Sequence, residues 1–119
     1  MAEGSGGAKN IATWVLTVLL AALFAFAGFT KVSGAVEVAS AFMKFGYPVW
    51  FSYIIGAIEI GCALLLFAPR VAAYAAGLLI LVMFGAIVSH LRAGESPLTP
   101  VIVLVLLIAV AFLRRPQTA

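Results

Sequence analysis

Long apolar segments separated by short polar ones make up most of this chain of 119 residues. The four apolar segments cover about residues 11–30, 50–67, 71–90 and 98–113. A helix needs roughly 20 apolar residues to cross a hydrocarbon core about 30 Å thick. The pattern therefore predicts an all-α, polytopic membrane protein whose four transmembrane helices form a bundle.

The two ends of the chain lie outside this pattern. Residues 1–10 are polar and Gly-rich, which predicts a disordered tail in front of a membrane domain over residues 11–115. Residues 116–119 are predicted to form a short C-terminal tail.

The segment between the first two spans is too polar to cross a membrane. Glu37, Ser40 and Lys44 recur at helical spacing on one side, and apolar residues including Phe42 and Phe45 fall on the other. This pattern predicts a short amphipathic helix on the membrane surface or over the end of the bundle. An ordinary structured loop is the alternative.

Composition supports the membrane assignment. The chain is 66% hydrophobic and 9% charged, with a mean hydropathy of +1.25, whereas soluble domains are about half apolar and about one quarter charged. The formal net charge is +3. Its seven Lys and Arg residues are spread thinly between apolar segments, which argues against a nucleic-acid-binding patch.

The basic residues also predict an orientation, because four spans place both termini on one side of the membrane. The terminal side holds Lys9, Arg70, Arg114 and Arg115, and the opposite side holds Lys31, Lys44 and Arg92. Because basic residues favour the cytoplasm, we expect both termini to be cytoplasmic.

A cleavable signal peptide is the alternative for the first apolar segment. Lys9 precedes this segment, and Ala25-Phe26-Ala27 resembles a cleavage site. We favour a permanent span, because cleavage would leave three spans.

The second apolar segment carries a single acid, Glu59, near its middle. A carboxyl group at that depth is costly and needs a partner, a proton or a function. Lys31, His90 and Arg92 lie at the same predicted end of the bundle. These four residues predict a polar pocket floored by Glu59 and open to the non-cytoplasmic side. A structural ion pair between Glu59 and Lys31 is the competing interpretation.

Small residues on the third apolar segment predict a helix-packing surface. Gly77, Gly85 and Ser89 share one face, at spacings of eight and four residues. Such a stripe lets another helix backbone approach closely.

Metal and haem sites are not expected, because Cys62 and His90 are the single cysteine and the single histidine. With Glu59 they do not make a normal transition-metal shell, and two-histidine haem ligation would need two protomers. We therefore expect no metal and no cofactor held by the chain alone.

Several of these segments resemble the DoxX-like family of small four-helix membrane proteins. The matching pieces are GFTKV at Gly28–Val32, AFMKFGYPVW at Ala41–Trp50, IGAIEIGCALLLFAPR at Ile55–Arg70, GAIVSHLRAGES at Gly85–Ser96, and the closing FLRRP. The resemblance implies a four-helix bundle in the bacterial cytoplasmic membrane and an association with membrane redox systems. It marks Lys31, Glu59 and His90 as family landmarks without assigned reactions.

Three functions follow as hypotheses. The first is an accessory or lipophile-binding subunit of a membrane oxidoreductase, with a quinone or a lipid in the pocket. The second is a non-catalytic assembly or scaffold protein. The third is an isomerase-like enzyme that acts on lipids through Glu59 and His90. The residues leave open whether any reaction is catalysed, and whether the chain forms a homo-oligomer.

Overall fold

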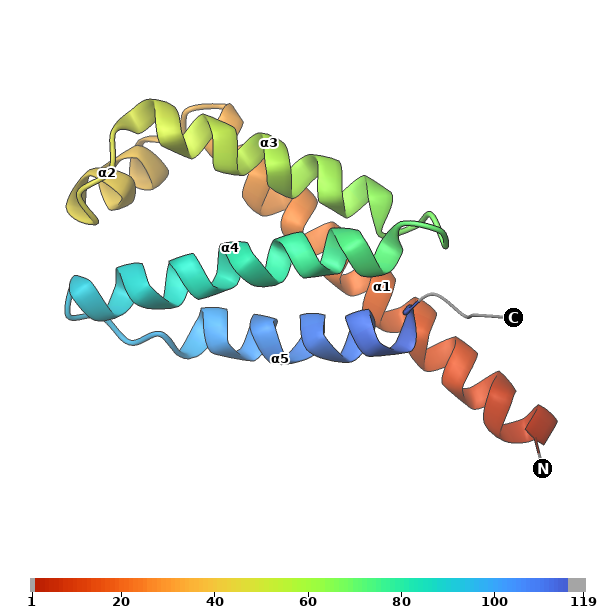
Figure 1. Ribbon diagram of the computed structural model, residues 1–119. Helices are drawn as coiled ribbons and strands as arrows, with labels where there is room; N and C mark the ends of the chain where they lie inside the picture. Colours follow the sequence, from red (N-terminus) through yellow and green to blue (C-terminus); the bar gives the residue numbers. More distant parts are fainter. Residues whose placement is uncertain (1, 116–119) are drawn as a thin grey trace.

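The computed structural model describes the backbone of residues 2–115 and the side chains from residue 7 onward. The described chain is helical and contains no strand. Its elements are α1 (Ala2–Val32), α2 (Val36–Lys44), α3 (Val49–Leu65), α4 (Ala72–Arg92) and α5 (Leu98–Leu113) (Figure 1). The predicted all-α class and the predicted helix between the first two apolar segments are confirmed.

The helices differ in their capacity to cross a membrane. Gly7–Val32 of α1 and all of α4 are long and apolar enough to do so alone. The bent pair of α2 and α3 makes a third candidate, and α5 is a shorter apolar helix. The described residues therefore contain two or three candidate spans by length and composition, compared with the four that the sequence predicts.

The start of α1 differs from the prediction. Residues 2–10 continue α1 instead of forming a disordered tail. Extending an existing helix costs little compared with nucleating one, and the Thr13 hydroxyl donates a hydrogen bond to the Lys9 carbonyl at 2.8 Å. The predicted tail over residues 116–119 lies outside the described residues.

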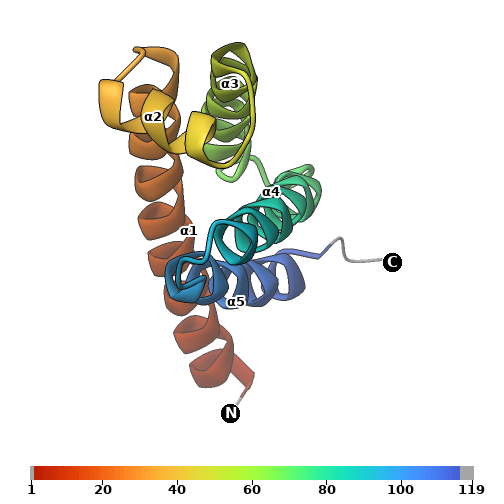
Figure 2. The same cartoon turned by 90° about the vertical axis from the view of Figure 1, so that its left-hand side faces the viewer.

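The long helices pack as two pairs. α1 lies against α3, and α4 runs antiparallel beside α5 (Figure 1). The view along the α4–α5 pair shows α1 crossing behind it, with α2 covering one end of α1 and α3 (Figure 2). The loop that joins α4 to α5 lies at the same end of the molecule as α2 (Figure 1).

The apolar core occupies the half of the bundle that is remote from α2. Phe24, Leu66, Leu79 and Leu107 are fully buried there, and they come from α1, the end of α3, α4 and α5. Many other large apolar side chains on these helices are exposed, among them Phe26, Leu64, Tyr74 and Leu81. Lipid is the solvent that accommodates such a surface without cost.

Glycines end the turns on both sides of α2. Gly34 and Gly46 have φ angles of 76° and 92°, a left-handed conformation that glycine adopts without steric cost. The turn at Gly46 lets the chain bend by 114° from α2 into α3. As a result α2 lies across the end of the bundle.

An arginine fixes the opposite end of α5 to α1. The guanidinium of Arg114 lies 4.6 Å from the centre of the Trp14 ring, and its Nη1 donates a hydrogen bond to Thr17 Oγ1 at 2.9 Å. A cation above an indole ring is attracted by the ring's electron density. This contact holds the two pairs of helices together near the chain termini.

Candidate functional site

A cavity of about 420 Å³ lies between α2, α3 and α4. Its size is in the range of pockets that hold small molecules. Apolar side chains line most of it, with a few polar groups at defined positions. The lining residues are Lys31, Phe42, Phe45, Tyr47, Phe51, Ile55, Glu59, Leu81, Val82, Met83, Gly85, Ala86, Ser89 and His90.

An ion pair between α1 and α3 forms the charged part of the wall. Lys31 Nζ lies 2.8 Å from Glu59 Oε1, and the two side chains are 17% and 3% exposed. Side chains on a helix lean toward its N-terminus, so in these antiparallel helices Lys31 and Glu59 lean toward each other. Within the described residues Oε1 has no hydrogen bond of good geometry, so the contact is an ion pair by distance.

Two glycines set the position of this ion pair. A Cβ on Gly28 would lie 2.6 Å from the Gly56 carbonyl oxygen, and one on Gly56 would lie 2.7 Å from Lys31 Cβ. Both distances are shorter than side-chain carbons tolerate. The backbones of α1 and α3 therefore meet at Gly28 and Gly56, and each charged residue follows its glycine by three positions on the same helix face.

Sequence reasoning missed this contact. The stripe that it singled out, Gly77, Gly85 and Ser89, is not a close helix contact within the described chain, because no atom lies within 4 Å of a Cβ built on either glycine. Gly85 instead lines the cavity. The signal for the true contact was the pairing of Gly28 with Lys31 and of Gly56 with Glu59, two matching glycine–charge motifs at the same predicted end.

The polar groups of the α4 wall are hydrogen-bonded to one another. Tyr47 Oη lies 2.7 Å from Ser89 Oγ, and Ser89 Oγ donates to the Gly85 carbonyl at 2.7 Å. His90 Nδ1 lies 2.8 Å from the Ala86 carbonyl oxygen, which can only accept, so Nδ1 carries the proton.

Aromatic rings form the wall on the side of α2 and the start of α3. Phe51 lies 6.3 Å from Phe42 and 5.3 Å from Tyr47 between ring centres. Phe45 lies 5.2 Å from the His90 ring. Tilted ring pairs of this kind are favourable. They leave a cavity surface suited to a flat, apolar group.

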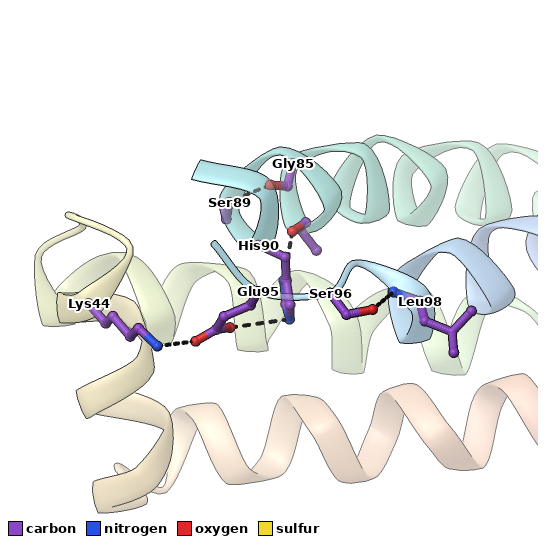
Figure 3. Close-up of polar contacts among 8 residues, drawn as sticks. Lys44, Gly85, Ser89, His90, Glu95, Ser96 and Leu98 are labelled. Atoms are coloured by element: carbon purple, nitrogen blue, oxygen red, sulfur yellow. Dashed lines mark hydrogen bonds and ion pairs between the residues drawn. The ribbon is translucent and has the colours of Figure 1, made fainter. Parts of the chain in front are cut away.

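A second polar cluster, beside His90, links α2 to the α4–α5 loop (Figure 3). Lys44 Nζ donates a hydrogen bond to Glu95 Oε2, and His90 Nε2 lies 4.0 Å from Glu95 Oε1. The hydrogen bond from Lys44, with a smaller contribution from the charges of Lys44 and His90, lowers the pKa of Glu95. We call Lys44, Glu95 and His90 the loop latch.

The structure brings together three of the four predicted pocket residues. Lys31, Glu59 and His90 line the cavity, whereas Arg92 is exposed and does not. Successive residues of a helix are rotated by about 100°. Arg92 therefore lies on nearly the opposite face of α4 from His90, which sequence position alone does not reveal.

Metal ligands do not cluster in the part of the chain that the structure describes. No group of three His, Cys, Asp or Glu side chains there could hold a metal ion.

Fold and site together define a small, all-helical membrane protein with a largely apolar cavity that contains one ion pair. The model of the DoxX-like family matches residues 15–112. The chain therefore belongs to the DoxX-like family, as its motifs indicated. No curated protein and no solved structure matches it.

Proposed function

We propose that this protein binds a lipophilic molecule, such as a quinone or a related lipid, in the cavity between α2, α3 and α4, as an accessory subunit of a membrane redox system. One observation carries the proposal. A cavity of about 420 Å³ with apolar and aromatic walls contains the ion pair Lys31–Glu59. Convergent polar groups in an otherwise apolar pocket are typical of small-molecule sites.

The cavity has a physical cause that favours a ligand. The buried core fills the half of the bundle remote from α2, and α3 and α4 lack a glycine contact that would close the other half. An ion pair on the wall of an apolar cavity is costly unless other polar groups satisfy it. A bound molecule with a polar head would supply those groups.

A pair of glycine substitutions on α4 tests ligand binding. Gly85→Leu adds a side chain where no atom obstructs it, at a position that lines the cavity. Gly77→Leu adds the same side chain in equally open space, two turns away and outside the cavity. Both changes improve helix propensity by about 1 kcal/mol, so the two variants should fold.

The assay is a titration of purified protein in lipid nanodiscs with 2-decyl-1,4-benzoquinone. We expect binding to weaken at least tenfold in Gly85→Leu and to stay at the wild-type level in Gly77→Leu. Equal binding by both variants would place the quinone outside the cavity and reject the proposed site.

The membrane topology that we propose has four spans. α3 and α5 contain 17 and 16 residues, or about 26 Å and 24 Å of helix, and a shorter span is accommodated by local thinning of the bilayer. α5 lies beside α4 along its length (Figure 1), which supports a shared depth. In the bacterial cytoplasmic membrane, we propose that both termini face the cytoplasm; a C-terminal reporter active only outside the cytoplasm would contradict this.

An assembly or scaffold role is the second candidate, and the direct contact between Lys31 and Glu59 favours it, because each charge already has a partner. In that case the Gly85→Leu variant would retain its partner proteins, and no lipophile would bind the wild type. The isomerase-like alternative receives less support, since the two ring nitrogens of His90 are directed at Ala86 and Glu95.

A further inference from the structure

The hydroxyl protons on the α4 side of the cavity are already committed to protein acceptors. Ser89 has one hydroxyl proton, which it donates to the Gly85 carbonyl. The contact between Tyr47 and Ser89 must therefore have Tyr47 as its donor, and Ser89 Oγ accepts. The proton on His90 Nδ1 is directed at the Ala86 carbonyl. None of these three protons is available to a ligand.

The charged donor and the charged acceptor of the cavity wall are the two members of the ion pair. Lys31 carries three protons on Nζ, and only one can point along the 2.8 Å contact with Glu59. Glu59 lines the same cavity. Its Oε1 is buried beside Lys31 Nζ, which leaves Oε2 as the carboxylate acceptor for a ligand. The cavity thus presents a charged donor and a charged acceptor side by side, at a distance that one ligand atom can bridge.

From this pairing we infer that the cavity selects a lipophile whose head is an un-ionised hydroxyl, such as a phenol or hydroquinone, over the corresponding ketone, quinone or ether. A hydroxyl oxygen accepts a hydrogen bond from Lys31 while its proton is donated to Glu59. A carbonyl or ether oxygen can only accept, so it satisfies Lys31 alone. The inference rests on the proposed function and specifies the head group that the same site prefers.

Charged head groups fit this arrangement less well. A carboxylate would approach Lys31 but would be repelled by Glu59, and an ammonium group would meet the opposite conflict. The aromatic wall formed by Phe42, Phe51 and Tyr47 offers ring faces and edges to a flat ring. These features favour a neutral, ring-borne hydroxyl.

Three probes of similar shape test the head group on wild-type protein in nanodiscs. They are 4-decylphenol, its methyl ether 4-decylanisole, and 2-decyl-1,4-benzoquinone. A hydrogen bond to a charged group that one ligand makes and the other cannot changes affinity by about tenfold or more. We expect 4-decylphenol to bind at least tenfold more tightly than either of the other probes.

Two variants test whether Glu59 is the source of the preference for 4-decylphenol. Glu59→Gln replaces the carboxylate by an amide that can donate to a carbonyl, so the preference for 4-decylphenol should fall to near unity. Arg92→Gln removes a charge at the same end of the protein, outside the cavity, and should keep the full preference.

The outcomes separate the two claims. If the wild type binds all three probes with equal affinity, the hydroxyl preference is wrong and lipophile binding stands. If it binds none of them, both the preference and the proposed function are wrong. A preference that survives in Glu59→Gln would also overturn the inference, because the acceptor would then lie elsewhere.

Discussion

The contact between Gly28 and Gly56 predicts a large difference between two similar substitutions on α3. In Gly56→Ala the new Cβ would lie 2.7 Å from Lys31 Cβ and 2.8 Å from the Gly28 carbonyl oxygen. In Gly61→Ala, five residues further along the same helix, no atom lies within 4 Å of the new carbon. The two variants therefore share the same chemical change and differ in their steric surroundings.

The geometry gives the size of the effect. Ordinary contact begins near 3.4 Å, so α1 and α3 must separate by about 0.7 Å to admit a methyl group at Gly56. Forcing a methyl group into a packed site costs about 1–3 kcal/mol, and replacing glycine by alanine in a helix returns about 1 kcal/mol. Since the return applies to both variants, Gly56→Ala should be about 1–3 kcal/mol less stable than Gly61→Ala.

The assay is unfolding by sodium dodecyl sulfate in mixed micelles, followed by the loss of helical circular dichroism. Gly61→Ala should match or exceed the wild type in its free energy of unfolding, and Gly56→Ala should fall below Gly61→Ala. Equal stability of the two variants would show that the backbones of α1 and α3 do not meet at Gly56, and would refute the account of how the ion pair is positioned.

Three further predictions follow from the polar groups and the single thiol. Because Lys44 lowers the pKa of Glu95, the loop latch should hold at neutral pH and be lost as the pH falls below the ordinary carboxyl value near 4.5. Amide hydrogen exchange in α2 should rise over the same pH range, and the Glu95→Gln variant should not show this pH dependence. Lys31→Met should destabilise the protein by about 3–5 kcal/mol in the same detergent unfolding assay, because it leaves Glu59 unpaired, whereas the double change Lys31→Met with Glu59→Met should cost less than this single change; additive losses would count against a direct ion pair. Cys62, 4% exposed within the core, should resist a water-soluble maleimide until the protein is unfolded in dodecyl sulfate, and rapid labelling of the folded protein would contradict this burial.

The apolar segments predicted most of the helical structure, because segment length and polarity are local properties. The last predicted span, residues 98–113, coincides with α5, and the predicted second and third spans agree with α3 and α4 within two residues at each end. The gathering of Lys31, Glu59 and His90 was also predictable, since counting residues along antiparallel helices gives each side chain an approximate depth.

The direction in which a side chain faces around its helix was harder to predict from the sequence than its depth along the helix. Arg92 has the same approximate depth as His90, but it faces away from the cavity, and a count of residues from the helix end does not register this difference. The choice between glycine stripes is similar. Gly77 with Gly85 and Gly28 with Gly56 both satisfy the rule that small residues admit a neighbouring helix. Only the arrangement of all the helices decides which pair is used.

The same arrangement explains why the cavity lies between α3 and α4 and not between α1 and α3. Gly28 and Gly56 bring α1 and α3 into backbone contact, which leaves no room between them for a ligand. Gly85 lines the cavity between α3 and α4, and a Cβ built on it would have no atom within 4 Å. Lys31 reaches that space only because its Cβ lies against Gly56 and its chain runs along α3 to Glu59. A bulkier residue at position 56 would therefore disturb both the helix contact and the polar wall of the cavity. Gly56→Ala should lower both the stability of the protein and its affinity for the ligand, whereas Gly85→Leu should lower the affinity alone.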